Sequence, residues 1–279
     1  MTFSRRKLLL MAPALLGMPL VARAVAPFRF GLTPVFLDND ATVIERLRAA
    51  LTTESGIELV QRRTYAEITG LLLEGAVDAA WLCGYPYLQH EEALSLLAVP
   101  VWQGAPLYRS YLITHNDDPA SGLSDLQGGT HAFSDPNSNS GYLVTASDLA
   151  RMRKRPETFF SRTIFAYGHR NVVRAVAQGL TRSGSVDGYV WEALTSVEPG
   201  LTTRTRVITK SELLGFPPFV ARRDRAGQPD VTKFKTALLG LRETATGQEA
   251  LALLQLDDVI EATPDLFDGI RARMRDVAD

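Results

Sequence analysis

The stretch of the chain richest in possible ligand donors spans residues 134–142 and contains three serines and two asparagines. It lies between a predicted strand and a predicted helix, and Ser138, Asn139 and Ser140 stand at the start of that helix. Free backbone N–H groups and the positive end of the helix dipole attract anions, and these side chains add further donors. The same residue types also form ordinary helix-capping turns, so the stretch alone does not establish a binding site.

Residue patterns typical of catalysis are absent from the sequence. The histidines have no metal-ligand spacing, and Ser140 precedes a glycine without forming a Gly-x-Ser-x-Gly elbow. Cys83 and His169 would make a nucleophile and a base, but no third group is evident to orient them. We therefore expect neither an enzyme nor a need for a metal or an organic cofactor. The four histidines are His90, His115, His131 and His169.

The composition is that of an ordinary globular protein, with 46% hydrophobic and 22% charged residues. A formal net charge of −1 gives no reason to expect nucleic acid or an acidic membrane as a partner. Cys83 is the only cysteine, which excludes an intrachain disulfide.

The N-terminus resembles an export signal. Residues 4–7 (SRRK) are basic, residues 8–21 are apolar, and Ala22-Arg23-Ala24 fits the small-x-small cleavage rule. The apolar run is short for a membrane span and is interrupted by prolines and a glycine, which disfavours the alternative of a membrane anchor. We predict that residues 1–24 are removed by cleavage near Ala24. The paired arginines favour the twin-arginine route over the general one.

From residue 28 onward, apolar periodicity predicts alternating strands and helices, the pattern of an α/β fold. Strands are predicted at 28–32, 57–60, 77–82, 96–101, 108–114, 130–133, 162–166, 186–190 and 207–209. Helices are predicted at 40–51, 65–74, 87–93, 123–126, 141–152, 171–178, 231–244 and 247–254, with a last one near Ile270.

This order predicts two lobes, each a mainly parallel sheet flanked by helices. The first comprises residues 25–114 and 215–279, and the second comprises residues 115–214. Carboxyl ends of strands face the crevice between such lobes, so a ligand is expected there.

Several stretches of the mature chain resemble the phosphate, phosphite and phosphonate periplasmic binding family, the solute-binding proteins of ABC uptake transporters. This resemblance implies the two-lobed type II periplasmic-binding-protein fold and a periplasmic, monomeric protein. It also implies a small oxyanion as ligand and an inner-membrane permease as partner. The matching stretches are 65–68 (YAEI), 77–81 (VDAAW), 108–111 (YRSY), 135–142 (DPNSNSGY), 167–169 (YGH) and 175–179 (AVAQG).

The resemblance also implies which residues form the ligand site. The helix start at Ser138, Asn139 and Ser140 would hold the anionic oxygens. Tyrosines of the first lobe and a histidine of the second would complete the clamp, because phenol and imidazole groups can donate to a phosphoryl oxygen. The residues at those positions are Tyr65, Tyr108 and His169.

The chain departs from the family where an amine-bearing phosphonate would need carboxylates. Asp187 and Glu192 are candidates for one acidic position, although either is equally compatible with a solvated loop. A second acidic position of the family falls near residues 215–219 (GFPPF), which contain no acid. We therefore expect a smaller oxyanion, or an uncharged hydroxylated ligand, rather than an aminoalkylphosphonate.

Cys83 is the second departure, at the end of a first-lobe strand that should border the cleft. Most free cysteines are small buried apolar residues. A thiolate would instead suit a soft centre such as trivalent arsenic, and relatives of the family include arsenite sensors that signal to a histidine kinase. An arsenite sensor is thus the alternative function, and Tyr85 is expected to line the pocket in either case.

Overall fold

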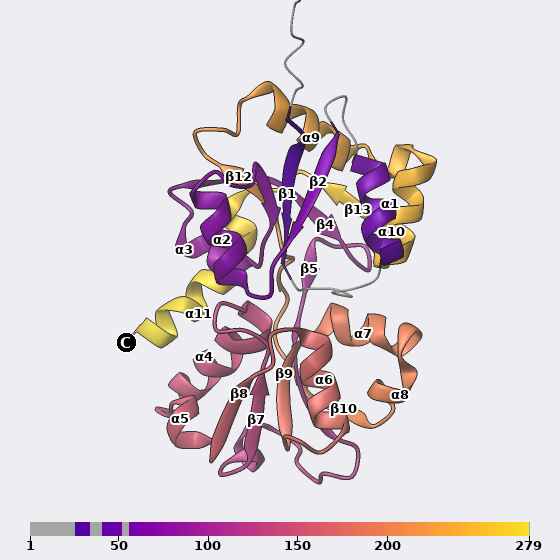
Figure 1. Ribbon diagram of the computed structural model, residues 1–279. Coiled ribbons are helices and arrows are strands. Elements are labelled where there is room, and N and C mark those ends of the chain that lie inside the picture. The colour runs from indigo at the N-terminus through magenta and orange to yellow at the C-terminus, as the bar shows by residue number, and fades with distance from the viewer. Residues whose placement is uncertain (1–25, 34–40, 52–55, 279) are drawn as a thin grey trace, which may run out of the picture.

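The computed structural model describes residues 26–33, 41–51 and 56–278, which form two lobes stacked one above the other (Figure 1). The predicted leader and its cleavage site lie outside the described residues. Within these described ranges, no helix is long and apolar enough to cross a membrane.

The first lobe is built on a six-stranded sheet of order β13-β4-β12-β3-β1-β2. Strand β1 pairs in parallel with β2 and β3, whereas β12 runs antiparallel to β3 and β4, and β13 runs antiparallel to β4. The strands are β1 (Phe28–Leu32), β2 (Ile57–Gln61), β3 (Ala79–Trp81), β4 (Leu94–Val101), β12 (Phe219–Arg222) and β13 (Asp258–Ile260). The helices are α1 (Ala41–Leu51), α2 (Tyr65–Leu73), α3 (Gly84–Gln89), α9 (Pro229–Leu239), α10 (Ala245–Leu254) and α11 (Asp268–Ala278), with η3 (Leu241–Glu243) and η4 (Pro264–Phe267).

The second lobe is built on a five-stranded sheet of order β10-β6-β9-β7-β8. Strand β7 pairs in parallel with β8 and β9, while β6 runs antiparallel to β9 and β10. The strands are β6 (Ser110–His115), β7 (Thr130–Phe133), β8 (Arg162–Phe165), β9 (Ser183–Asp187) and β10 (Thr205–Lys210). The helices are η1 (Leu123–Leu126), the π-helical turn η2 (Asn139–Leu143), α4 (Val144–Arg151), α5 (Pro156–Phe159), α6 (His169–Ala177), α7 (Gly188–Val197) and α8 (Pro199–Thr202).

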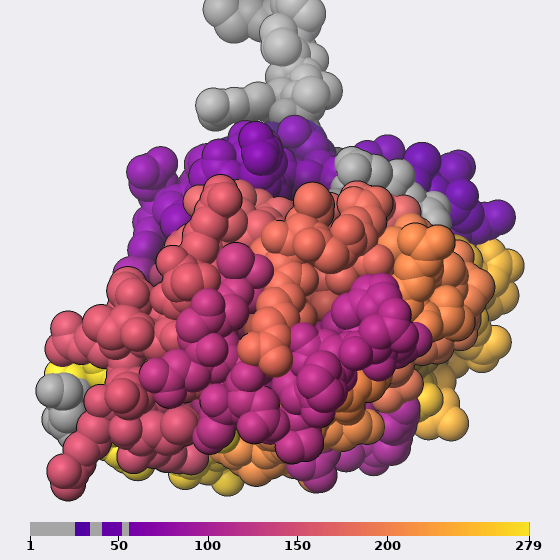
Figure 2. All heavy atoms as spheres, turned by 90° about the horizontal axis from the view of Figure 1, so that it is seen from below, coloured from indigo at the N-terminus to yellow at the C-terminus, as the bar shows by residue number. Residues whose placement is uncertain are grey.

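Two short strands connect the lobes. β5 (Leu107–Tyr108) and β11 (Leu214–Gly215) pair antiparallel with each other and belong to neither large sheet. The chain thus crosses into the second lobe after β5 and returns through β11. Seen from below, the second lobe covers most of the first, whose indigo and yellow segments emerge around its rim (Figure 2).

The two-lobed α/β fold is confirmed, with corrections in detail. Both sheets are mixed: each contains antiparallel pairs beside the parallel ones of the mainly parallel sheet that was predicted. The strand predicted at 108–114 as the end of the first lobe is largely β6, which belongs to the second sheet. A short apolar run has the same pattern in either sheet, so periodicity does not assign it to a lobe.

A further correction concerns residues 186–190, predicted as one strand. The strand ends at Asp187, and α7 begins at Gly188. The Asp187 carboxylate accepts hydrogen bonds from the backbone N–H groups of Tyr189 (2.9 Å) and Val190 (3.4 Å), which caps the helix. Aromatic and β-branched residues, which favour strands, occupy this first helical turn and caused the error.

Candidate ligand-binding site between the lobes

The serine-rich loop follows β7 and leads into η2 and α4. Ser138 is the N-cap, and its Oγ accepts a hydrogen bond from the Gly141 backbone N–H at 3.0 Å. A Cβ on Gly141 would lie 1.8 Å from Ser134 Oγ and 2.7 Å from Ser134 Cβ. Glycine is therefore required for the helix start to pack directly on the end of β7.

Several polar groups of this loop are buried without a hydrogen bond of good geometry. Ser134, Asn139 and Ser140 are each at most 1% exposed. Among the described residues, Ser134 Oγ, Asn139 Oδ1 and Ser140 Oγ make no hydrogen bond of good geometry, and the Tyr108 hydroxyl lies beside Ser140 Oγ. Buried polar groups are normally satisfied, because leaving one unpaired costs free energy. Such a concentration at one helix start is expected where a ligand supplies the missing partners.

Tyr65 brings the first lobe to this loop. Thr64 and Glu67 form a capping box that places Tyr65 at the first position of α2. The Tyr65 backbone N–H donates to Asp135 Oδ2 at 3.2 Å. The Tyr65 hydroxyl lies 3.3 Å from His169 Nε2. One residue of the first lobe thus contacts two segments of the second.

Tyr108 and Cys83 make two more contacts across the lobes, both with Asn139. The Asn139 side-chain amide donates to the Tyr108 hydroxyl at 2.8 Å, and its backbone N–H donates to Cys83 Sγ at 3.2 Å. Burial raises the pKa of the Cys83 thiol to about 11. The sulfur is therefore a neutral thiol and serves here as a hydrogen-bond acceptor.

His169 is held as a neutral donor. It is the first residue of α6, and its Nδ1 accepts the backbone N–H of Asp187 at 3.0 Å. Burial lowers the pKa of His169 to about 3, so the ring is uncharged at neutral pH. Since Nδ1 accepts, the single ring proton is on Nε2, which points at the Tyr65 hydroxyl.

The remaining predicted site residues occupy different surroundings. Asp187 is 1% exposed at the end of β9, whereas the side chain of Glu192 is 35% exposed. Glu192 accepts a hydrogen bond from the Tyr111 hydroxyl at 2.9 Å and pairs with Lys210 at 3.9 Å. Tyr85 is half-buried in the first turn of α3, the helix that begins directly after Cys83.

Two buried residues of the same loop were not singled out from the sequence. Ser134 contributes one of the unpartnered hydroxyls, and Asp135 binds the start of α2. Both are residue types common in turns, so only their position between β7 and the helix start at Ser138 indicated a role in the site.

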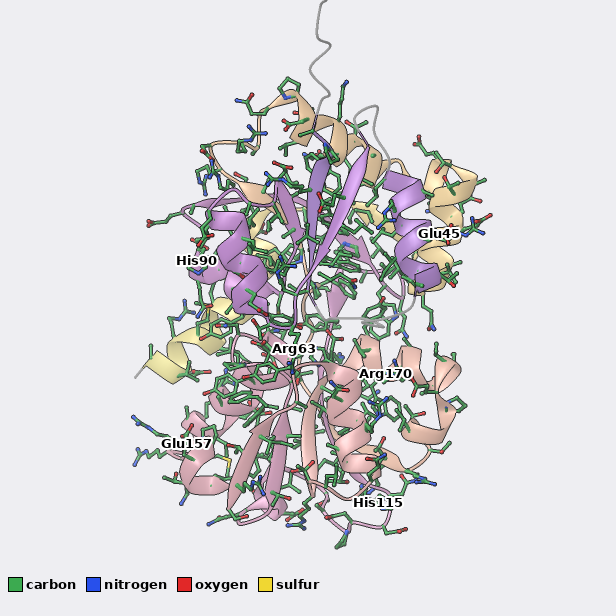
Figure 3. All side chains as sticks on the ribbon, in the orientation of Figure 1. Glu45, Arg63, His90, His115, Glu157 and Arg170 are labelled. Atoms are coloured by element: carbon green, nitrogen blue, oxygen red, sulfur yellow. The ribbon has the colours of Figure 1, made fainter. Side chains whose placement is uncertain are left out.

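The histidines outside this cluster have structural surroundings. His90 and His115 lie on different lobes, away from the meeting point (Figure 3). His131 is fully buried, and its two ring nitrogens contact Ser183 Oγ at 2.7 Å and Ser185 Oγ at 2.9 Å. In the part of the chain that the structure describes, no group of three or more His, Cys, Asp or Glu side chains is arranged to hold a metal.

Asp187 gives a testable pH dependence. Burial raises its pKa from 3.8 to about 7, so the folded chain binds a proton that the unfolded chain releases between about pH 4 and 7. Stability contributed by this group is therefore full below about pH 4 and falls as the pH rises to about 7. In Asp187→Asn this loss of stability with rising pH should disappear. The free energies of unfolding of the two proteins should therefore diverge between pH 4 and 7 by on the order of a few kcal/mol.

The measurement is urea unfolding of both proteins from pH 4 to 8. The histidines are common to both and cancel in the difference. A wild-type-minus-variant difference independent of pH would contradict this assignment.

The geometry defines a class of protein. Two α/β lobes are joined by a two-stranded connection, and polar groups from both lobes meet at a buried cluster containing unpartnered donors. This is the arrangement of a two-lobed substrate-binding protein that encloses a small ligand.

Comparison with known sequences identifies the family. Residues 30–267 match the periplasmic substrate-binding proteins of phosphonate ABC transporters, and the chain belongs to this family, as its resemblance predicted.

Two characterised relatives share part of the chain. The phosphate-import protein PhnD of Mycolicibacterium smegmatis is 28% identical over 200 residues, which cover 66% of this chain and 61% of that protein. The phosphonates-binding periplasmic protein of Escherichia coli is 30% identical over 170 residues, covering 57% of this chain and 49% of that protein. The matched region thus spans between about half and three fifths of these relatives.

Solved structures agree in fold over nearly the whole chain. A binding protein component of an ABC phosphonate transporter from Pseudomonas aeruginosa has a TM-score of 0.79 at 24% identity, covering 90% of this chain and 87% of its own. PhnD1 from Prochlorococcus marinus, in complex with methylphosphonate, has a TM-score of 0.78 at 16% identity, with coverages of 90% and 98%.

Proposed function

We propose that this protein captures a small phosphorus oxyanion of the phosphonate, phosphite or phosphate class between its lobes and delivers it to an inner-membrane ABC permease without chemical change. The observation that carries the proposal is the pair of buried hydroxyls at Ser134 and Ser140, each of which can donate to an anionic oxygen. Family membership and the names of the relatives, a phosphate-import protein and a phosphonates-binding protein, support the same ligand class.

The donors match an oxyanion held by hydrogen bonds. Ser140 can donate its hydroxyl and Tyr65 its phenol, while the His169 Nε2–H is directed at the Tyr65 oxygen and leaves the phenol proton free to donate; all three groups are buried. None of the three carries a charge at neutral pH, so recognition depends on oriented dipoles and on the helix start. Interactions of this kind are stronger in a dry site than in water.

Closure of the lobes follows from where these groups originate. Tyr65 and Tyr108 belong to the first-lobe side, whereas Asn139 and His169 belong to the second lobe. A ligand that touches both sets binds the closed form more tightly than the open form and therefore favours closure. Direct contacts such as Tyr65–Asp135 already hold the two sides together in this conformation.

The amine-free ligand class is part of the proposal. The Asp187 carboxylate already accepts a hydrogen bond as the cap of α7, and Glu192 pairs with Tyr111 and Lys210. Residues 215–219 offer no acid. We therefore expect methylphosphonate, phosphite or phosphate to bind in preference to an aminoalkylphosphonate.

The arsenite alternative depends on a thiolate at Cys83. Burial holds this thiol in its neutral form, and its sulfur already accepts the Asn139 N–H. Metal and metalloid ligation requires loss of the thiol proton, so the structure favours the oxyanion proposal over the sensor.

A thermal-shift screen of residues 25–279 tests both functions. The ligands are phosphate, phosphite, methylphosphonate, 2-aminoethylphosphonate, sulfate, arsenate and arsenite. A ligand at a hundred times its Kd should stabilise the folded protein by about 2.7 kcal/mol and raise its Tm. We expect a shift with at least one phosphorus oxyanion, and we expect the same shift in Cys83→Ser.

The outcomes separate the two functions. A shift with arsenite alone that is lost in Cys83→Ser would replace the uptake proposal with the sensor. A larger shift with 2-aminoethylphosphonate than with methylphosphonate would overturn the amine-free ligand class.

A further inference from the structure

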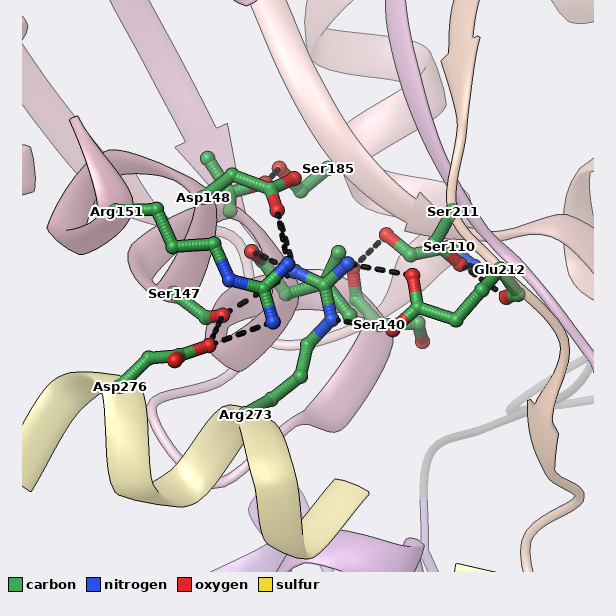
Figure 4. Close-up of polar contacts among 12 residues, drawn as sticks. Ser110, Ser140, Ser147, Asp148, Arg151, Ser185, Ser211, Glu212, Arg273 and Asp276 are labelled. Carbon is green, nitrogen blue, oxygen red and sulfur yellow. Dashed lines mark hydrogen bonds and ion pairs between the residues drawn. The ribbon is translucent and has the colours of Figure 1, made fainter. Parts of the chain in front are cut away.

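Arg273 of α11 lies almost fully buried between two other segments of the chain, with 3% of its side chain exposed. Its Nε donates to Glu212 Oε1 at 2.8 Å, and its Nη1 donates to the Val144 backbone carbonyl at 3.0 Å and to Ser147 Oγ at 3.3 Å. It also pairs with the Asp148 carboxylate (Figure 4). A single guanidinium thus joins the C-terminal helix to the segment between β10 and β11 and to α4.

The position of α11 explains how Arg273 reaches both segments. Its first turn packs on the first lobe, where Ile270 contacts Gly84 at the start of α3. Its second half lies beside α4 of the second lobe (Figure 1). The helix therefore bridges the lobes, and Arg273 lies where it crosses.

The contacts of Arg273 meet the helix that begins at the ligand loop. Val144, whose carbonyl accepts from Arg273, directly follows η2, and η2 contains Asn139 and Ser140. Two of the other partners, Ser147 and Asp148, lie on the next turn of the same helix. Arg273 thus holds this helix within one turn of the unpartnered donors.

Residues next to the two connecting strands, at the start of β6 and just after β10, hold the same loop from its other side. Ser110 Oγ donates to the Ser140 carbonyl at 2.6 Å, and the Ser110 backbone N–H donates to Ser211 Oγ at 2.9 Å. Glu212, the ion-pair partner of Arg273, is the next residue after Ser211. The network therefore closes on itself. One path runs from Arg273 through Glu212, Ser211 and Ser110 to Ser140 (Figure 4). The other runs from Arg273 through Val144 back along η2.

We propose that Arg273 is a positioning residue of the binding site. It fixes the anion-binding helix start against the residues next to β5 and β11, namely Ser110, Ser211 and Glu212, without touching the ligand. This inference rests on the proposed function for its binding readout. A buried guanidinium with a fixed fork of donors suits the task, because it satisfies two carboxylates and a carbonyl at set directions.

The test compares Arg273→Met with Arg182→Met. Arg182 is the control, since it also binds a carboxylate (Asp118, 2.8 Å) and a backbone carbonyl (Asp125, 2.8 Å), although its side chain is 34% exposed against 3% for Arg273. Arg182 directly precedes β9, so it lies at the opposite end of that strand from Asp187 and the site. Two quantities are measured: the Kd for methylphosphonate by calorimetry, and amide hydrogen exchange over residues 138–145 in the ligand-free protein.

We expect Arg273→Met to weaken methylphosphonate binding at least about tenfold and to speed exchange over 138–145. Arg182→Met should leave both within about twofold, even if its Tm falls equally. Glu212→Gln removes one ion pair and keeps the contacts with α4, so it should shift both quantities in the same direction by less. This milder variant carries the test if Arg273→Met does not fold.

Unchanged exchange over 138–145 in Arg273→Met, or an equal loss of binding in Arg182→Met, would overturn the positioning role. If the wild-type protein binds no phosphorus oxyanion, the proposed function fails, and the exchange measurement still decides the role of Arg273.

Discussion

Gly141→Ala should weaken oxyanion binding by at least about a hundredfold, equivalent to about 2.7 kcal/mol. The new Cβ would lie 1.8 Å from Ser134 Oγ and 2.7 Å from Ser134 Cβ, so rotating the serine hydroxyl away does not relieve the overlap. The helix start must then move off the end of β7, and overpacking of this kind typically costs about 1–3 kcal/mol. The same movement displaces Asn139 and Ser140 from the positions in which they face the first lobe.

Calorimetric titration with the strongest ligand of the thermal-shift screen measures this effect. Gly70→Ala in α2 is the matched control, because a Cβ there meets no atom within 4 Å. Gly70→Ala should bind like the wild type. Wild-type affinity in Gly141→Ala would show that the ligand is not held by this helix start.

The double variant Ser138→Ala with Ser140→Ala should weaken binding by about 1–3 kcal/mol, the cost of losing donors in a desolvated site. Ser140 would lose a buried hydroxyl that makes no hydrogen bond of good geometry among the described residues. Ser138 would lose the oxygen that accepts the Gly141 N–H, so the cap of η2 is weakened as well. The loss should appear mainly as faster dissociation of the ligand.

Stopped-flow dissociation and equilibrium titration measure the double variant. Its control is Ser121→Ala with Ser161→Ala, which changes two exposed serines of the same lobe. A double variant that retains wild-type affinity would remove the serine-rich loop from the proposed site.

The fold was predictable where elements are local and periodic. Strand β1 and helix α2 begin at the residues that apolar patterning indicated, and Gly75, with φ of +76°, ends the α2 turn as a helix-terminating glycine does. Assignment of residues 110–115 to a sheet was not predictable from periodicity, because it depends on pairing with β9 and β10, more than 60 residues further along the chain.

The candidate site shows the same division. The serine-rich loop stands out locally, because donors gather at one strand-to-helix turn. The choice of Nε2 as the protonated nitrogen of His169 depends on the Asp187 backbone N–H, 18 residues away. The contacts of Arg273 with α4 and Glu212 join residues between 61 and 129 positions apart, and no spacing rule reaches that far.

The hydrogen bond from Asp187 to His169 has an evolutionary consequence. The group that fixes the histidine tautomer is a main-chain N–H, which every residue except proline provides. The Asp187 side chain serves a separate task as the cap of α7, and serine or asparagine can perform that task as well. Substitutions at this position can therefore change the side chain next to the candidate site while the histidine keeps its proton on the same nitrogen. The tautomer of His169 is thus insensitive to the identity of residue 187, proline excepted.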